Sequence, residues 1–583
     1  MDVSFKGREW LLREVQEPAV SVLAKGLGID PMVGRLLYLR GVRTEAEGQV
    51  FLECGLHQLT NPAEIPGIRD AADRIVTALE RKEKICIYGD YDCDGVTATS
   101  LMVLILRCLG AQVSYFVPHR LKHGYGLHKA AIKEISDAGA DLLVTVDNGI
   151  SAHEEILLAR SLGLEVIVTD HHEPPDILPE TPFLVNPKVH DRLADPEGEQ
   201  IIDHFSVLSG VGLAFGLMVA VRARMREKYG TDTALPNLRE YLDLVAIGTI
   251  ADVVPLVRSN RILVRHGLVE IGKSRNPGIR ALMGAAGLQG SVVTPGHVGF
   301  QLAPRINAAG RMGDAGLALT LLISSDPREV EEAAARLNVE NAKRQEVEQV
   351  ILAEALEQIE AYRRDDRVIV LHSDGWHPGV IGIVASRIVE RFFRPTILIS
   401  RKNGIGTGSG RSIPRFSLYE ALHSCRGALE GFGGHAMAAG LTISWDRIEE
   451  FREAVNRYAK QVLKEDDLIP RSRVDGVLDP GDISEVLVAE LERLKPFGMG
   501  NPEPLFLSPQ VNVDGCTVVG TNHLKFRFPG RGGPVTAIGF NMGEFMEKIE
   551  GGPALDLLYQ LRFNEFRGRR SIQAVLADLK YSV

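Results

Sequence analysis

The sequence lacks the features of membrane, secreted and disulfide-bonded proteins. No apolar run approaches the roughly 18 to 20 residues that a membrane-spanning helix needs. The opening residues, MDVSFKGREW, do not have the basic and then apolar layout of a signal peptide. The cysteines form no CxxC pair and show no regular spacing, which predicts reduced structural thiols. Together these absences predict a cytoplasmic protein.

Two common ligand-binding motifs are also missing. The glycine-rich segment 404–414, GIGTGSGRSIP, lacks the terminal Lys-Ser/Thr of a P-loop and the full spacing of a dinucleotide fingerprint, which argues against ATP and NAD. The run from Asp90 to Gly95 begins like a calcium-binding EF-hand loop, but Leu101 stands where that loop needs its last Glu. A broad basic nucleic-acid surface is disfavoured by the net charge of -10, although an acidic metal site would itself contribute several of these charges.

What is present is the composition of an ordinary globular protein. The chain has 583 residues, of which 45% are hydrophobic and 24% charged. That length predicts about three or four domains. Composition alone therefore does not indicate a function, and the evidence for one comes from particular segments.

The segment ICIYGDYDCDGVTAT, residues 85–99, is the most informative of these. An apolar run that favours a strand passes through Gly89 into Asp90, Asp92 and Asp94, and a helical pattern begins at about Val96. Three carboxylates so close together repel one another unless a cation lies between them or they face water. A divalent metal site and a solvated acidic turn are both open from this segment alone, and Cys93 is a weaker candidate for a thiolate ligand.

The same arrangement recurs twice downstream. Residues 141–149, DLLVTVDNG, are an apolar strand that ends in Asp147, and residues 164–172, LEVIVTDHH, are another that ends in Asp170, His171 and His172. An amphipathic helical stretch precedes each, and this alternation predicts βαβ units with a parallel sheet. Ligands bind beyond the carboxyl ends of such strands. The polar clusters are therefore expected to meet there and to suit Mn²⁺, Mg²⁺ or Zn²⁺.

Asp252 is a further candidate ligand, in the apolar segment GTIADVVPL. Taken singly, such an aspartate fits a helix cap or a surface turn as well as it fits a metal ligand. In order along the chain, however, DxDxDG, a strand-end Asp, Asp-His-His and GTIAD resemble the motifs of the DHH phosphoesterase superfamily.

The resemblance implies a metal-dependent phosphoesterase and assigns roles to individual residues. Two divalent cations, Mn²⁺ or Mg²⁺, would be held by Asp92, Asp94, Asp147, His171 and Asp252, with Asp90 as a further ligand or as a carboxylate behind the ligands. His172 would contact the scissile phosphate or act in acid catalysis, beside the catalytic Asp94 and Asp147.

Residues 299–312, GFQLAPRINAAGRM, form a candidate anion site. Arg305 and Arg311 are separated by small residues and Asn307, which lets guanidinium groups approach an anion closely. Segments in which arginines only cap helix ends have the same composition, so a structural role is the alternative. A similar segment faces the metal site in the nuclease branch of the superfamily, so the resemblance implies phosphate contacts for both arginines and a DNA contact for Asn307.

A long helix is predicted next. A proline in the first turn follows Ser325 and Asp326, and the periodic pattern then runs on without Gly or Pro to Arg364. About 37 residues would span roughly 55 Å. This length favours a connector between two lobes, with a coiled-coil seam as the alternative.

A second α/β region follows this helix. A strand from Val368 to Leu371 leads to a loop with Trp376 and His377, both predicted to contact DNA, and then to a helix and another strand. The segment 404–414 is expected to be a glycine-rich loop in which Ser409 and Arg411 hold a phosphate. With GFGGHAMAAGL (431–441) it resembles the DHHA1 domain of nuclease members. That resemblance implies a site for the 5′-terminal phosphate of the substrate at Ser409 and Arg411, lined by His435.

The last hundred or so residues are expected to form an all-β module. Residues 511–583 contain nine Lys/Arg and seven Asp/Glu, so this end is mildly basic. Phenylalanines alternate here with cations, a pattern that suits either base stacking beside a basic groove or an ordinary barrel core. The predicted DNA contacts are Phe526 and Arg527, and the pattern also includes Lys525, Phe528, Arg562, Phe563, Phe566 and Arg567.

The predicted fold class is therefore α/β: a parallel-sheet DHH metal domain, a long helix, a second α/β (DHHA1) domain and a C-terminal all-β OB-like barrel. The predicted boundaries are 1–75 for a helical lead-in, 76–325, 326–365, 366–463 and 464–583. The resemblance implies an exonuclease that degrades single-stranded DNA from the 5′ end to nucleoside 5′-monophosphates in DNA repair and recombination, assisted by a helicase and a single-strand-binding protein. The alternatives are a phosphoesterase for short oligonucleotides or phosphoadenosine phosphate, and a non-catalytic protein that binds single strands.

Overall fold

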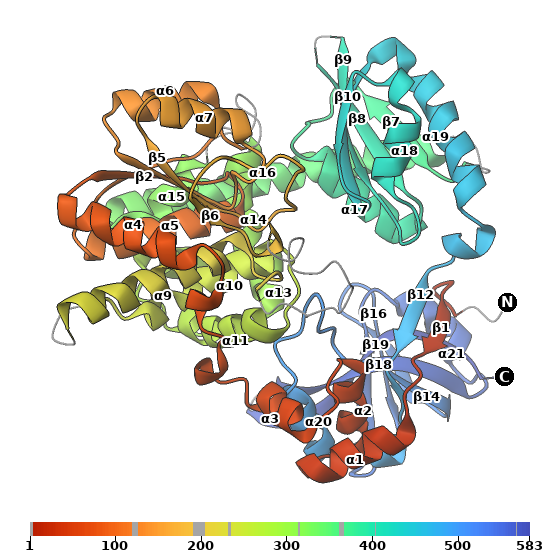
Figure 1. Ribbon diagram of the computed structural model, residues 1–583. Coiled ribbons are helices and arrows are strands. Elements are labelled where there is room, and N and C mark those ends of the chain that lie inside the picture. The colour runs from red at the N-terminus through yellow and green to blue at the C-terminus, as the bar shows by residue number, and fades with distance from the viewer. Residues whose placement is uncertain are drawn as a thin grey trace. The chain divides into compact units, whose positions relative to one another are not determined.

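A computed structural model describes residues 4–118, 126–189, 205–230, 235–312, 315–360, 366–402, 404–566 and 568–582. The chain divides into two compact units. The parallel-sheet unit contains Gln49–Ala342 and Leu494–Pro502. The two-sheet unit, named for its two larger sheets, contains Met1–Gly48, Lys343–Arg493 and Glu503–Val583. Each unit is described by itself below, with the element labels of Figure 1.

The parallel-sheet unit is built on five strands in the order β3-β2-β4-β5-β6, all parallel. Their bounds are β2 Lys84–Tyr88, β3 Gln112–Phe116, β4 Leu142–Val146, β5 Glu165–Thr169 and β6 Phe183–Val185. The central strands are apolar at nearly every position because helices cover both faces of the sheet. This confirms the parallel α/β sheet expected from the alternating sequence pattern.

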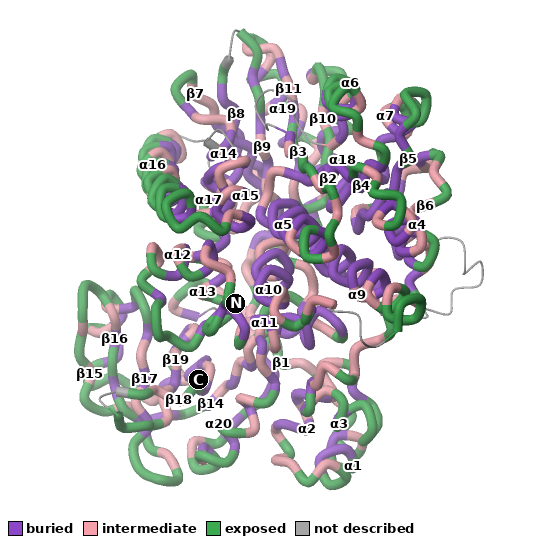
Figure 2. Tube along the Cα trace, turned by 90° about the vertical axis from the view of Figure 1, so that its left-hand side faces the viewer, coloured by how far each residue is buried: buried purple, intermediate pink, exposed green. Residues whose placement is uncertain are grey.

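Successive residues of each strand enter different cores, as the period of two requires. Ile85 and Ile87 of β2 belong to the core on one face, with helices α4, α5, α9 and α10. Cys86 and Tyr88 belong to the smaller core on the other face, with α6 and α7. Figure 1 shows α6 and α7 on one side of the sheet and α4 and α5 on the other. In Figure 2, α5 and α10 are buried along most of their length.

Helices complete the parallel-sheet unit. Their bounds are α4 Ile68–Arg81, α5 Cys93–Cys108, α6 Lys129–Asp137, α7 His153–Ser161, α9 Gly210–Tyr229, α10 Leu242–Ala251, α11 Arg258–Gly272, α12 Pro277–Ala285, α13 Pro295–His297, the π-helical turn η4 Val298–Leu302, α14 Ala303–Met312 and α15 Gly316–Ile323. Residues 190–204, which include His190 and His204, lie outside the described residues.

Helix α16, Pro327–Glu360, has residues in both units, since they divide between Ala342 and Lys343. Its first half packs Val330, Ala333 and Leu337 into the core of the parallel-sheet unit. Farther along, Arg344 and Arg387 both contact the buried carboxylate of Glu348, which ties α16 to helix α17 (Ile381–Phe392). The predicted long connecting helix is present, and its predicted end at residue 365 lies outside the described residues.

The first sheet of the two-sheet unit has the order β10-β11-β9-β8-β7. Its strands are β7 Ile369–Ser373, β8 Thr396–Lys402, β9 Ile405–Arg411, β10 Gly431–Gly434 and β11 Ala438–Ser444, and it packs with α17, α18 Leu418–Ser424 and α19 Ile448–Val462. The prediction of a glycine-rich loop at 404–414 was wrong, because residues 405–411 are strand β9 between β8 and β11.

Alternate glycines explain how this strand fits. A Cβ at Gly406 would lie 2.8 Å from Ile399 Cγ2, and one at Gly408 would lie 2.7 Å from Leu441 Cγ. Gly406, Gly408 and Gly410 are buried, whereas Ser409 and Arg411 alternate with them. The glycines therefore let bulky neighbours close over one face of β9, and Ser409 and Arg411 project from the other.

The C-terminal sheet has the order β13-β14-β18-β19-β17-β16-β15 and is mostly antiparallel. Its strands are β13 Gly476–Val477, β14 Phe506–Val511, β15 Asp514–Val519, β16 His523–Phe528, β17 Val535–Gly539, β18 Leu555–Phe566 and β19 Arg569–Tyr581, with the short helices α20 Glu485–Glu492 and α21 Met546–Ile549. Of the predicted basic and aromatic pattern, the Phe566 side chain and Arg567 lie outside the described residues.

The beginning of the chain packs with this C-terminal region. Strand β1, Glu9–Leu12, pairs in parallel with β12, Arg471–Val474, and helices α1 Glu17–Leu27 and α2 Pro31–Leu39 follow it. The Asp578 carboxylate accepts hydrogen bonds from Ser4 and from Trp10 Nε1. Helix α3, Glu45–Glu53, then leads into the parallel-sheet unit.

The cysteines and the apolar helices bear on two of the predictions made from the sequence. All six cysteines are free thiols, namely Cys54, Cys86, Cys93, Cys108, Cys425 and Cys516. Among the described residues, no helix combines the length and the apolar character that crossing a membrane requires.

Candidate metal centre

The acidic and histidine motifs meet at the carboxyl ends of three neighbouring parallel strands. The acidic loop of Asp90, Asp92 and Asp94 follows β2, Asp147 follows β4, and the Asp-His-His triplet follows β5. Asp252 joins them from the end of α10. Three overlapping groups of these side chains have possible ligand atoms within 4.8 Å of one another: Asp147, His171 and His172; Asp94, His171 and Asp252; Asp90, Asp92 and Asp147.

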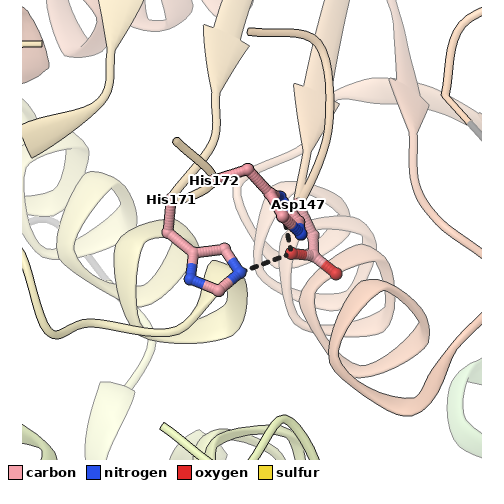
Figure 3. Close-up of side chains that lie close together, drawn as sticks. All are labelled: Asp147, His171 and His172. Atoms are coloured by element: carbon pink, nitrogen blue, oxygen red, sulfur yellow. Dashed lines mark ion pairs between the residues drawn. The ribbon is translucent and has the colours of Figure 1, made fainter. Parts of the chain in front are cut away.

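Asp147 faces both His171 and His172, and dashed lines join it to each of them in Figure 3. Its Oδ1 is 3.1 Å from His171 Nε2 and 4.0 Å from His172 Nδ1. His171 Nε2 is also 3.6 Å from Asp252 Oδ2. Asp147 has a positive φ of 63°, an uncommon conformation for a residue with a side chain, and its Cβ lies only 2.6 Å from where a Cβ on Gly210 would be. Glycine at position 210 therefore lets the start of α9 approach this carboxylate.

The acidic loop is held by main-chain contacts. Asp92 caps helix α5, since its Oδ1 accepts from the Gly95 N–H at 3.0 Å. A Cβ at Gly95 would lie 2.7 Å from the Asp90 backbone nitrogen, so the loop is too tight there for a larger residue. The Cys93 N–H, between Asp92 and Asp94, donates to Asn307 Oδ1 at 2.9 Å.

Asp94 is bound at the start of helix α9. Its Oδ2 accepts from the Gly210 N–H at 2.7 Å and its Oδ1 from the Val211 N–H at 3.0 Å. The first N–H groups of a helix lack partners within the helix and carry partial positive charge, so they stabilise a carboxylate. Ser209 caps the same helix and also contacts Thr249 on α10, which connects the two helices that supply Asp94's donors and Asp252.

The electrostatics of the cluster favour a bound cation. Burial, and then the charges of Asp252 and Asp92, raise the pKa of Asp94 well above its usual value, and burial followed by Asp94 and Asp92 does the same to the pKa of Asp147. Burial also raises the pKa of Asp252 to about 6. Within the described part of the chain, Asp147 Oδ1, His171 Nε2 and Asp252 Oδ2 are buried without a hydrogen bond. Carboxylate oxygens and an imidazole nitrogen in this state fit a divalent metal ion.

The two adjacent histidines have opposite character. Burial, and then the charge of His172, lower the pKa of His171 to about 3, so its ring is neutral, as a metal ligand must be. Burial also acts to lower the pKa of His172, but the hydrogen bond from its Nδ1 to Asp170 Oδ1, 2.7 Å long, outweighs it and the pKa rises to about 9. Asp170 is fully buried and accepts in addition from the Ile150 N–H at 2.9 Å. It fixes the orientation of the His172 ring.

A cavity of about 280 Å³ opens onto the cluster. It is lined by Asp90, Tyr91, Asp92, His172, Ala251, Asp252, Asn307, Gly310 and Arg311. Carboxylates and Arg311 share this lining, an arrangement that can hold a metal ion together with an anionic group.

A second polar site lies in the two-sheet unit, at the end of β9. Arg411 Nη1 donates to Ser409 Oγ at 3.2 Å, and a Cβ on Gly382 would lie 2.8 Å from that oxygen and 3.0 Å from Arg411 Nη2. Gly382 is the second residue of α17, so the start of a helix, a guanidinium and a hydroxyl adjoin one another. Arg411 pairs with Ala438 on β11, at the end where the turn with His435 joins β10 to β11. These groups together fit an anion.

Comparisons with known proteins agree with this architecture. Family profiles match residues 84–249 (DHH family, N-terminal domain), 365–461 (DHHA1 domain) and 474–578 (RecJ OB domain). The single-stranded-DNA-specific exonuclease RecJ of Bacillus subtilis strain 168 is 39% identical over 98% of this chain and 71% of its own length. RecJ of Escherichia coli K12 is 38% identical over 94% and 96%.

This chain belongs to the RecJ family.

A solved RecJ has the same fold. The crystal structure of RecJ from Thermus thermophilus in complex with Mn²⁺ matches with a TM-score of 0.83 and 32% identity, over 99% of this chain and 80% of that one. RecJ from the same organism was also solved in complex with Mg²⁺. The divalent-metal prediction is thereby confirmed, and the acidic cluster of this RecJ-family chain is the group of side chains that fits such an ion.

Several residues predicted to contact substrate form hydrogen bonds to other protein groups in this RecJ-family structure. Arg305 is not part of the cavity lining, and its guanidinium donates to Asn338 Oδ1, Gln301 O and Ala285 O. Trp376 is buried and its Nε1 donates to Glu354, which contradicts a DNA contact. The main-chain oxygen of His377 accepts from the N–H groups of Val380 and Ile381, so this residue belongs to the turn that leads into α17.

The prediction that Phe526 contacts DNA was wrong. Phe526 is 0% exposed and Phe528 is 2% exposed, because both point into the core of the C-terminal sheet. Arg527, between them on β16, is exposed, and so is Lys525. The alternation of aromatic and basic residues is thus that of a strand with one face inward, so a base has no access to the rings.

Sequence reasoning missed the residues that orient the ligands. The sequence marks Asp170 only as a member of the Asp-His-His motif. It does not show that the Asp170 carboxylate bonds to His172 Nδ1 and orients that ring. Gly210, Val211 and Asn307 supply main-chain or amide contacts to the acidic loop from distant segments. The Ser209-Gly210 pair at the start of a helix is a cap signal, but nothing local indicates which carboxylate it meets.

Proposed function

We propose that this chain is a metal-dependent exonuclease that hydrolyses single-stranded DNA from the 5′ end to nucleoside 5′-monophosphates. The observation that carries the proposal is the buried cluster of carboxylates and His171, in a chain that aligns over almost its whole length with single-stranded-DNA-specific exonucleases. Two divalent cations, Mn²⁺ or Mg²⁺, would be bound by Asp90, Asp92, Asp94, Asp147, His171 and Asp252.

Bound cations would activate water for attack and offset the charge that develops on the phosphate. The chain supplies the arrangement around them. Helix α9 holds Asp94 through two N–H groups, and the tight turn at Gly95 keeps Asp90 and Asp92 in place. Burial keeps His171 neutral, so that its Nε2 lone pair is available for a metal.

His172 is the proposed acid of the reaction. Its Nδ1 donates to Asp170, so Nε2 is the nitrogen that a phosphate oxygen in the cavity can reach. A ring with a pKa of about 9 is protonated at neutral pH and can donate a hydrogen bond, or a proton, to the departing 3′ oxygen. Arg311, which lines the same cavity, would bind a phosphate oxygen.

The site of Ser409 and Arg411 is the proposed anchor for the 5′-terminal phosphate, with His435 near it. A charge-assisted contact from Arg411 would be reinforced by the start of α17. Such an anchor, separate in sequence from the metal ligands, accounts for hydrolysis from one end. We also propose that a helicase and a single-strand-binding protein deliver the substrate in repair and recombination.

The decisive experiment follows digestion of single-stranded DNA labelled at the 5′ or the 3′ end, in the presence of Mn²⁺. Early release of a labelled mononucleotide from the 5′ label alone supports the proposal. Cleavage restricted to very short oligomers would instead support a phosphoesterase for short oligonucleotides. Binding of single strands without cleavage would support the non-catalytic alternative.

A further inference from the structure

Phe300 is among the most exposed large apolar residues in the described part of the chain. Its exposed fraction is 85%, while Val298 and Leu302, two residues away on either side, are fully buried. A single exposed apolar side chain is ordinary on a protein surface. The position of this ring in the helix that leads to the metal cavity is what suggests a function for it.

The backbone at Phe300 is unusual. Residues Val298–Leu302 form a π-helical turn that runs directly into α14, Ala303–Met312. Such turns are rare and occur frequently at functional sites. Here the buried Val298 and Leu302 fix the turn to the core, and Phe300 between them points outward.

Phe300 lies in the continuous helix that lines the metal cavity farther along. Residue 300 stands seven residues before 307 and eleven before 311 in this helix, with part of the π-helical turn in between. Asn307 and Arg311 line the cavity. At 1.5 Å per residue, Phe300 lies about 10 Å along the helix from Asn307.

A second contact, from a different helix, agrees with this placement. A Cβ on Gly299 would lie 3.8 Å from Ile250 Cγ2. Ile250 belongs to α10, which ends directly before Asp252. The residue directly before Phe300 therefore lies against the helix that ends before Asp252, and Phe300 itself continues into the helix that carries Asn307, Gly310 and Arg311.

We propose that Phe300 is a stacking platform for a base of the single-stranded DNA, on a nucleotide that lies outside the one being hydrolysed. The inference rests on the proposed function. The sequence around the ring favours a base over a protein partner, because its chain neighbours Gly296, Gly299 and Gln301 add no large apolar side chain beside it. Stacking is tolerant of sequence, as degradation of any single strand requires.

The test measures binding of a fluorescein-labelled, 5′-phosphorylated oligonucleotide to the full chain in EDTA, by fluorescence anisotropy. Phe300→Ala should raise the Kd by about 5- to 100-fold, the loss expected for one stacked base. The matched control is Val292→Ala, which changes another apolar residue of the same unit, 87% exposed, and should bind like the unmodified protein. In Mn²⁺, hydrolysis of a dinucleotide by Phe300→Ala should be unchanged, because that substrate does not reach the ring.

Phe300→Trp provides a direct signal. It should keep the original Kd, and its added tryptophan emission should be quenched by single-stranded DNA, beyond any change shown by the native Trp10, Trp376 and Trp445. A Kd for Phe300→Ala equal to that of Val292→Ala, or no quenching in Phe300→Trp, overturns the inference. If the unmodified chain cleaves DNA but shows no dependence on Phe300, only this inference fails. If it binds through Phe300 without cleaving, only the proposed nuclease function fails.

Discussion

The metal centre and the anion site at β9 are built from opposite kinds of sequence. The metal centre uses charged residues that follow three parallel strands and helix α10, and the residue types of its proposed ligands are those that bind metals. The anion site uses Ser409 and Arg411 on a regular strand whose alternate residues are glycines packed into the core. The metal-ligand motifs can be identified from residue type alone. The anion site on β9 can be identified only when it is known which residues of the strand face the core and which face away from it.

The largest effect is expected at the metal centre. Asp94→Ala should lower exonuclease activity by more than about 100-fold, the upper range for residues that merely support metal ligands. The reason is the loss of a carboxylate that α9 holds in place through Gly210 and Val211. Rates at several Mn²⁺ concentrations, with circular dichroism as a check on folding, would measure it. Near-normal activity in this variant would show that the cluster is not the reaction centre.

Asp170→Asn should reduce activity by about 10- to 100-fold without removing a proposed ligand. The Asp170 carboxylate raises the pKa of His172, so its neutralisation should lower that pKa and move the alkaline loss of activity to lower pH. The pH profile of kcat separates this effect from damage to metal binding. An unchanged profile with lower activity would mean that Asp170 only supports the fold around Ile150.

Arg411→Ala tests whether the strand site has the function of an anchor. It should raise the KM for 5′-phosphorylated single strands by about 10- to 100-fold, the cost of one charged hydrogen bond, and affect 5′-hydroxyl ends much less. Arg411→Lys keeps the charge and should recover part of the loss. Equal losses on both kinds of end would assign Arg411 a structural role.

The smallest effect concerns stability and the buried face of β9. Gly408→Val should destabilise the chain by about 1–3 kcal/mol, because the new side chain would overlap Leu441 and Ile399. Thr407→Val, on the exposed face of the same strand, is the control and should have little effect. Thermal unfolding of both variants would compare them. Equal midpoints would contradict the packing role of the glycines.

The prediction from sequence succeeded where residue type and periodicity carry the information. The strands before Asp90, Asp147 and Asp170 were apparent because a sheet covered on both faces needs continuous apolar runs. The long helix at 327–360 was apparent because neither glycine nor proline interrupts its pattern. The free thiols followed from the absence of paired spacing.

It failed where a local pattern fits two structures equally well. Glycine-rich composition suits a loop as well as a strand pressed between bulky neighbours, and only the pairing of β9 with β8 and β11 distinguishes them. Phe526 alternates with basic residues whether its ring faces a base or the core. Trp376 and Arg305 belong to plausible binding segments, but each has a partner on another helix.

The sequence by itself determined the chemistry: which residues can bind metal, in what order they occur, and which strands deliver them to one edge of a parallel sheet. Tertiary structure alone decided how those groups are held. Asp94 depends on helix α9, the Cys93 N–H on Asn307 in α14, and Phe300 is exposed through a π-helical turn. The physical reason is that periodicity and side-chain type are local properties, whereas hydrogen-bond partners and burial are set by segments far away along the chain.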